Sequence, residues 1–162
     1  MGGVDNWLFP KFSIDTPVDL EQGYAYQTLA TNMRGFNQNI RNGSSFAVIN
    51  SELRFPIIRY FANRPIKSDF LNNLQLVGFG DIGTAWTGIQ PWSEENFLFT
   101  KRIRQAPMNI TVKVQKEPVV GGVGFGARTR LLGYFIRADV AWGIEDMVAQ
   151  PAVFYLSLSL DF

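Results

Sequence analysis

Cysteine and histidine are both absent from the 162 residues of this chain. Their absence excludes thiol catalysis, imidazole catalysis and almost all zinc sites, because these chemistries require the missing side chains. Charged residues make up only 18% of the chain, below the usual share of about a quarter. The net charge of +1 gives no general attraction toward nucleic acid. We expect a protein that holds no metal and no cofactor.

Long apolar runs are missing as well, although aromatic residues reach 14%. No run approaches the roughly 18 residues of a membrane helix. Residues 1–5 contain no basic segment that leads into an apolar core, so we expect no secretory signal there. Either the protein is cytosolic or the chain is a piece of a longer protein, and the patterns described below favour a piece. The lack of cysteine fits an oxidising envelope compartment.

What the sequence does contain is alternation of apolar and polar residues with a period of two, which predicts β-strands. The alternation is cleanest at the C-terminus, where one face takes Phe154, Leu156, Leu158, Leu160 and Phe162. It also predicts strands over 44–55, 74–86, 119–132 and 134–142, and a weaker one over 23–31. These segments are near the roughly 9–11 residues with which a tilted strand crosses a bilayer. The sequence therefore predicts an all-β fold of antiparallel strands.

Three features favour a transmembrane β-barrel. The apolar faces end in aromatic residues, as in the aromatic girdles of outer-membrane barrels: Phe55, Trp86, Tyr134, Trp142, Phe154 and Phe162. The polar faces carry charges that either pair with one another or line a lumen: Arg54, Arg128, Arg130, Arg137 and Asp139. The connections alternate between a tight one at 131–133 and a long external loop expected at about 87–118. A soluble β-sandwich with one wet face is the alternative.

Three motifs also occur in the order found in a known family: Arg34-Gly35-Phe36, then Asn50–Pro56, then Gly78–Trp86. They resemble the C-terminal half of the bacterial surface-antigen barrels, which belong to the superfamily of outer-membrane assembly factors and two-partner-secretion transporters. In that family an Arg-Gly-Phe or Arg-Gly-Tyr tip closes a long external loop that folds back into the barrel, here at about 31–45. A Phe-x-Asp-x-Gly motif, here Phe79–Gly83, lies on a following strand.

The resemblance runs from about Tyr24 to Phe162, and the chain looks especially like barrels that Bacteroidetes-type bacteria attach to long periplasmic regions. It implies a barrel of about sixteen strands, of which this chain supplies about the last five or six. The run that ends in Phe162 also resembles the terminal signal by which such barrels are recognised for insertion. Because an open sheet leaves unsatisfied backbone edges in lipid, we expect the missing N-terminal strands to come from outside this segment.

The motif residues suggest a latch between the loop and the strands. Parity places Glu52 and Asp81 on the polar faces of neighbouring strands. An inward-folded loop brings Arg34 to them, and its planar guanidinium suits carboxylates. Gly35 permits a sharp tip, and Phe36 packs inside the barrel. The resemblance implies the same contact, whereas the alternatives are a solvated arginine and a hydrolytic carboxylate pair, which no nucleophile pattern accompanies.

The resemblance implies a barrel of the cell outer membrane that inserts or translocates other polypeptides and has no enzymatic activity. In the family's mechanism, a client strand adds at the seam of the barrel, where residues 154–162 would lie. We expect as partners the outer-membrane lipid, the missing barrel strands, client polypeptides and periplasmic or surface proteins, but no nucleic acid. Two other classes stay open: a barrel that anchors a larger envelope complex, and a soluble β-sandwich binding module.

Overall fold

Five long strands form one curved antiparallel sheet in the computed structural model, which describes residues 1, 31–57, 68–93, 96–105 and 108–160. The strands are β1 (Ser45–Pro56), β2 (Gln75–Trp86), β5 (Val120–Leu131), β6 (Tyr134–Glu145) and β8 (Val153–Leu160). They pair in the order β1-β2-β5-β6-β8, and the short β7 (Val148–Ala149) also pairs with β6. The prediction of an all-β, antiparallel fold is confirmed.

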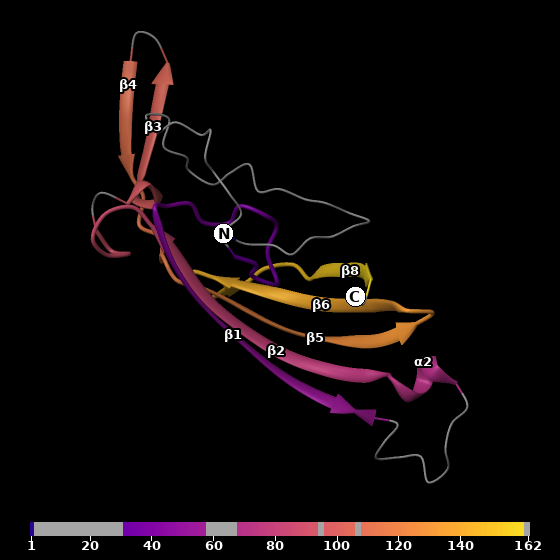
Figure 1. Cartoon of the computed structure of the whole chain (residues 1–162). Coiled ribbons are helices and arrows are strands. Elements are labelled where there is room, and N and C mark those ends of the chain that lie inside the picture. Colours follow the sequence, from indigo (N-terminus) through magenta and orange to yellow (C-terminus); the bar gives the residue numbers. More distant parts are fainter. Residues whose placement is uncertain (2–30, 58–67, 94–95, 106–107, 161–162) are drawn as a thin grey trace.

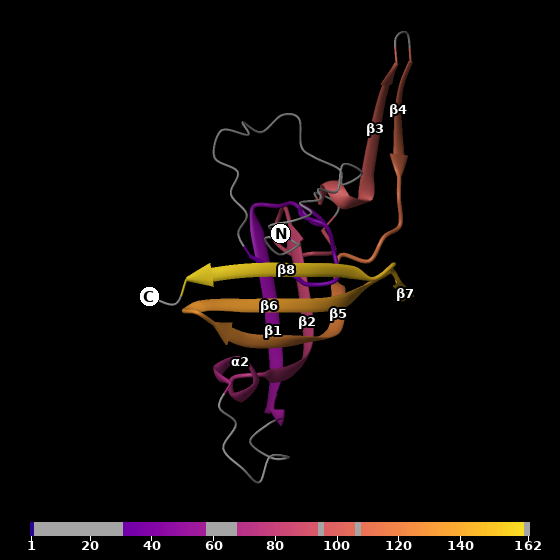
Figure 2. The ribbon, with the colours of Figure 1, turned by 90° about the vertical axis from the view of Figure 1, so that its right-hand side faces the viewer.

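The sheet that the described residues form is not closed. Among the described residues, pairing ends at β1 on one side and at β8 on the other. The weaker strand expected over 23–31 lies outside the described residues except for Thr31, and so does Phe162. Segment 31–44 lies over one face of the sheet, which we call the inner face (Figure 1). Figure 2 gives the perpendicular view.

Two tight turns join neighbouring strands without a longer loop. Leu132 and Gly133 connect β5 to β6 with φ of 52° and 85°, and Asp146 and Met147 connect β6 to β7 with φ of 51° and 62°. Two successive positive φ values define the turn whose twist matches that of paired strands. The tight connection expected at 131–133 is therefore present.

A β-bulge separates β7 from β8. The registers of these two strands against β6 differ by one residue, so one extra residue lies within 150–152. Pro151 lies in this stretch, where its missing N–H removes no bond from the ladder. The amide of Gln150 still donates to the carbonyl of Gly143 at 2.7 Å.

The long connection expected at 87–118 has secondary structure of its own. The 3-10 helix η2 (Phe97–Phe99) leads into a hairpin of β3 (Thr100–Gln105) and β4 (Met108–Lys113), which forms a separate two-stranded sheet. The hairpin projects away from the main sheet in both views (Figures 1 and 2). The segment is not a loop throughout, because the β-branched residues at 110–114 favour a strand.

The helices of the described residues are few and short. The α-helix α2 (Asp69–Asn72) precedes β2, and η2 precedes β3. Within the described ranges, no helix has the length and apolar character needed to cross a membrane.

In the part of the chain that the structure describes, the core lies on the inner face, beneath segment 31–44. One buried cluster joins the segment to the strands: Met1, Met33, Phe36, Ala85 and Val120. A second cluster lies on the strands themselves: Val77, Phe79, Ala141 and Tyr155. The opposite, outer face carries large apolar side chains that remain exposed on all five long strands: Ile49, Leu53, Leu76, Ile82, Val123, Phe125, Tyr134, Phe154 and Leu158.

Candidate functional site

The tip of segment 31–44, Arg34-Gly35-Phe36, is buried against the inner face. Arg34 is only 5% exposed. Gly35 has a φ of 93°, a value that residues with a side chain rarely adopt. A Cβ at Gly35 would also lie 2.6 Å from backbone atoms of Trp142 and Gly143. Only glycine fits here, which agrees with the sharp tip expected from the sequence.

Glycines of β5 and β6 form the floor on which the tip rests. A Cβ at Gly122 would overlap the carbonyl oxygen of Arg34, and a Cβ at Gly143 would lie 2.5 Å from the ring of Phe36. The glycines therefore let a second layer of backbone approach the sheet more closely than side chains would allow.

Arg34 and Asp81 form a two-pronged ion pair. Nε of Arg34 donates to Oδ2 at 2.7 Å and Nη2 donates to Oδ1 at 2.6 Å, so the guanidinium fork meets both carboxylate oxygens. The backbone amide of Arg34 also donates to Oδ2, at 3.1 Å. Asp81 is 1% exposed, and these bonds satisfy a charge that water does not reach.

The remaining guanidinium nitrogen of Arg34 reaches a second carboxylate. Nη1 donates to Oε1 of Glu52 at 2.5 Å, and Cζ lies 3.7 Å from the centroid of the Phe79 ring. Burial by itself lowers the pKa of Arg34, but the hydrogen bonds and charges of Asp81 and Glu52 outweigh burial and raise that pKa above its ordinary value. The structure thus brings together the three charged residues that the sequence placed in a latch.

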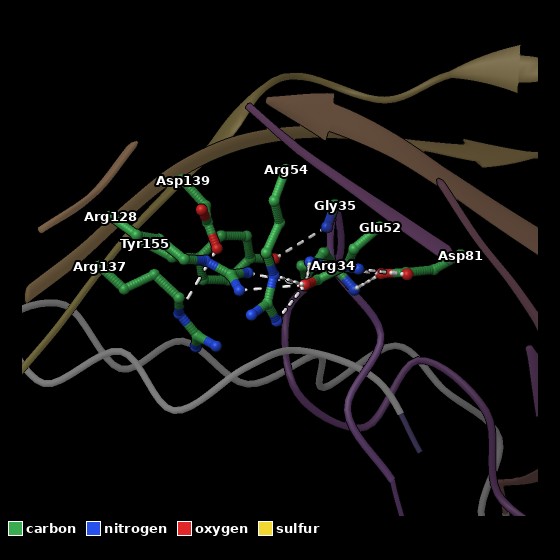
Figure 3. A network of polar contacts seen from close by, with 9 residues as sticks. All are labelled: Arg34, Gly35, Glu52, Arg54, Asp81, Arg128, Arg137, Asp139 and Tyr155. Carbon is green, nitrogen blue, oxygen red and sulfur yellow. Dashed lines mark hydrogen bonds and ion pairs between the residues drawn. The ribbon is translucent and has the colours of Figure 1, made fainter. Parts of the chain in front are cut away.

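Glu52 joins this pair to a wider network of arginines (Figure 3). Arg128 of β5 donates to both oxygens of Glu52, at 3.0 and 2.7 Å. Arg54 of β1 donates to Oε2 through two nitrogens, at 3.1 and 2.8 Å. The network ties the loop tip to β1, β2 and β5, and two residues expected only in the lumen wall, Arg54 and Arg128, belong to it.

Tyr155 of β8 holds the backbone of the loop tip. Its hydroxyl donates to the carbonyl of Phe36 at 2.7 Å and accepts from the amide of Gly35 at 3.0 Å. Sequence parity placed Tyr155 on the polar face but gave it no role. A tyrosine on the polar face of a strand usually finds a hydrogen-bond partner for its hydroxyl when it is buried, and this signal could have identified Tyr155.

The other residues expected in the lumen wall also lie on the inner face. Arg137 and Asp139 are neighbours on β6, with Nε of Arg137 3.4 Å from Oδ2 of Asp139 (Figure 3). Asp139 is buried, and neither of its oxygens accepts a hydrogen bond from the described residues. Arg130 is exposed near the end of β5.

A second arginine of the loop, Arg41, anchors its base. Arg41 is buried; Nη1 donates to Oε1 of Glu145 at 2.7 Å, and Nη2 donates to the carbonyl of Glu117 at 3.0 Å. Nζ of Lys116 lies 2.6 Å from the same Glu145 oxygen. The sequence pattern missed Arg41, because nothing in the loop motif distinguishes a buried arginine from a solvated one.

The C-terminal alternation is present in β8. Phe154, Leu156 and Leu158 pair with Val140, Ala138 and Ile136, the outer-face positions of β6. Leu160 is the last residue of β8, and Phe162 lies outside the described residues. The role of this run as an insertion signal stays a prediction.

The arrangement is chemically suited to holding a conformation. Guanidinium groups occupy the carboxylates of Glu52 and Asp81, so neither carboxylate is poised to accept a proton from a substrate. In the part of the chain that the structure describes, no three acidic side chains gather where a metal ion could bind.

No protein-family model, no curated protein and no solved structure matches the chain. Its function must therefore be inferred from the geometry of the latch and of the sheet that carries it.

Proposed function

We propose that the chain is part of the wall of a β-barrel in the cell outer membrane, of the surface-antigen type. The proposed activity of this barrel is to insert or translocate other polypeptides. One observation carries the proposal: the sheet has an apolar, exposed outer face and a charged inner face to which a loop is latched.

The outer face supports a lipid environment. Ile49 on β1 is 73% exposed and Phe125 on β5 is 59% exposed, and similar side chains stand on the strands beside them. Soluble monomers rarely expose a continuous apolar patch of more than a few hundred Å². Strands of membrane barrels, by contrast, alternate between lipid-facing apolar residues and lumen-facing polar ones.

The inner face supports a lumen. Its charges are paired with one another, as in the contact of Arg128 with Glu52, and they surround a loop that fills space beside the sheet. The two unpaired sheet edges, at β1 and β8 among the described residues, would be costly in lipid. Further strands, from elsewhere in the protein or from other chains, complete the wall.

The proposed handling of polypeptides rests on β8. In the described residues β8 pairs with β6 alone, so its other edge presents backbone donors and acceptors to which an extended client strand can add. The latch holds the loop tip against β8 through Tyr155. The loop tip is therefore bonded directly to β8, the strand that would form the proposed seam.

The membrane proposal is tested by fractionating cells that express the whole protein. We expect the chain in the outer-membrane fraction, resistant to extraction by urea and soluble only in detergent, with altered gel mobility before heating. Recovery in the aqueous fraction without detergent would contradict the proposal and favour the soluble β-sandwich binding module.

The activity is tested by depleting the protein and measuring the folded amounts of other outer-membrane and secreted proteins. We expect specific clients to decrease, and a cysteine placed at Ser159, near the end of β8, to cross-link to them during assembly. Membrane insertion with no affected client would refute the transport activity and favour a barrel that anchors an envelope complex.

A further inference from the structure

The β3–β4 hairpin concentrates positive charge. Residues 100–113 contain four of the fifteen Lys and Arg of the chain and none of its fourteen Asp and Glu. The four are Lys101, Arg102, Arg104 and Lys113. Because the whole chain has a net charge of only +1, the rest of the chain is net negative and the hairpin is a separate basic element.

The pairing register divides the hairpin into two alternating sets of positions. One set is entirely polar or basic: Thr100, Arg102, Arg104, Asn109, Thr111 and Lys113. The other set is mainly apolar: Lys101, Ile103, Gln105, Met108, Ile110 and Val112. The hairpin is therefore amphipathic in its sequence and register, with its cations mostly in one set.

The apolar set lacks cover where its side chains are described. Ile110 is 46% exposed and Val112 is 40% exposed. The amide of Val114 donates a hydrogen bond to the carbonyl of Phe99 at 2.9 Å, which fixes the base of the hairpin. Among the described residues, the hairpin shares no pairing with the main sheet, and it projects from that sheet (Figure 2). A lone two-stranded hairpin is at best marginally stable in water, so a surface that covers its apolar set would stabilise it.

We propose that the β3–β4 hairpin docks onto an anionic lipid surface, with the basic set of register positions toward phosphate-bearing head groups. Basic residues near a membrane surface are attracted to anionic lipids, and amphipathic elements lie at the boundary between head groups and acyl chains. An acidic protein surface would match the basic set but not the apolar one. The inference rests on the membrane location proposed above.

The absence of cysteine permits a single reporter. The whole protein with Ile110→Cys, labelled with a dye that responds to polarity, is reconstituted into nanodiscs of phosphatidylcholine alone or of phosphatidylcholine with phosphatidylglycerol. We expect a blue shift and stronger emission only in discs that contain phosphatidylglycerol. Roughly 1 M salt should reverse the shift, because the screening length then falls to about 3 Å.

Two matched variants separate charge from fold. Arg102→Glu with Arg104→Glu should abolish the shift, whereas Arg102→Lys with Arg104→Lys should retain it, since the positive charge is kept. Entry of both variants into discs, as efficiently as the parent, shows that the barrel itself is intact.

Three results would overturn the docking and leave the membrane location standing. One is equal emission in both kinds of disc, and another is a shift that survives the double change to Glu. The third is a shift induced in detergent by polyglutamate but not by phosphatidylglycerol, which would assign the hairpin to an acidic protein. A protein that enters neither kind of disc would refute the membrane location and the docking with it, whereas entry without a shift refutes the docking alone.

Discussion

At the scale of single residues, the stability of the latch depends on which charge is left unpaired when one partner is removed. Both oxygens of the Asp81 carboxylate are bonded to Arg34, and the carboxylate has no exposed surface. A buried charge that loses its partner is far more costly than a pair that was never made. Substitutions in the latch should therefore be compared by the charge that they leave behind.

Arg34→Ala should lower the free energy of unfolding by about 3–5 kcal/mol, because it leaves Asp81 buried and unpaired. Arg34→Lys should recover only part of the loss, since an ammonium group cannot form the two-pronged contact. Arg34→Ala combined with Asp81→Asn should be more stable than Arg34→Ala alone. Urea unfolding in detergent, followed by tryptophan fluorescence, measures these differences. If Arg34→Ala is as stable as the parent, the latch has no structural role.

Tyr155→Phe should destabilise the protein by about 1–3 kcal/mol, because it leaves the Gly35 amide and the Phe36 carbonyl without their partner. Thermal unfolding monitored by circular dichroism measures the change. Ser157→Ala is the matched control, since Ser157 occupies the next inner position of β8. Equal midpoints for the two variants would show that the hydroxyl of Tyr155 contributes nothing.

At the scale of elements, the inner face is shaped to accept segment 31–44. Gly122 and Gly143 leave space beneath the tip, while Arg41 ties the base of the segment to the end of β6. The segment is thus held at two separate points, and loosening one should expose it without unfolding the sheet.

Gly143→Ala should displace the loop tip, because the new methyl group would meet the ring of Phe36 and the carbonyl of Gly35. The reporter is Asn37→Cys, labelled by a water-soluble maleimide, and we expect faster labelling in the Gly143→Ala background. Gly80→Ala is the control: a Cβ there has no neighbour within 4 Å in the described structure. The same labelling rate in both backgrounds would refute the close fit.

Arg41→Ala should cost about 2–3 kcal/mol of stability, since it breaks charged hydrogen bonds in a buried setting. Lys116→Ala should cost less than about 1 kcal/mol, because Lys116 is more exposed and Glu145 keeps its bond to Arg41. Thermal unfolding of the two variants in one detergent compares them. A larger loss for Lys116→Ala would show that Arg41 is not the anchor.

The sequence predicted the strands well because the period of two is a local signal, visible in runs such as Phe154–Leu160. It also predicted the meeting of Arg34 with Asp81, since parity and the motif agreed. It did not identify Tyr155 and Arg41, because alternation assigns a residue to a face of the sheet but indicates neither its burial nor its hydrogen-bond partner. The β3–β4 hairpin lies within the stretch at 87–118 that the sequence predicts as a loop, because polar residues are frequent throughout that stretch.

At the scale of the whole molecule, the two faces of the sheet call for different surroundings. A charge on a lipid-facing position of a barrel costs about 2–4 kcal/mol near the bilayer midplane. The same charge on the inner face meets the charged side chains that lie there. The outer and inner positions of one pair of strands should therefore respond in opposite ways.

In the proposed membrane barrel, Ile82→Arg should reduce recovery of the protein from the outer-membrane fraction, because Ile82 lies on the outer face in the middle of β2. Asn50→Arg should be tolerated, since Asn50 lies on the inner face opposite Asp81. Immunoblots of membrane and aqueous fractions compare the two variants. Equal recovery of both would mean that the outer face does not meet lipid.

The contact between Gly35 and Tyr155 also constrains the order in which parts of the fold form. The two residues lie 120 positions apart, whereas β5, β6 and β7 are joined by two-residue turns that close quickly. The tip can engage Tyr155 only after β8 has arrived at the edge of β6. The hydrogen bonds of Tyr155 to the loop tip therefore report that β8 has joined the sheet, whereas the pairing of Arg34 with Asp81 requires only β2.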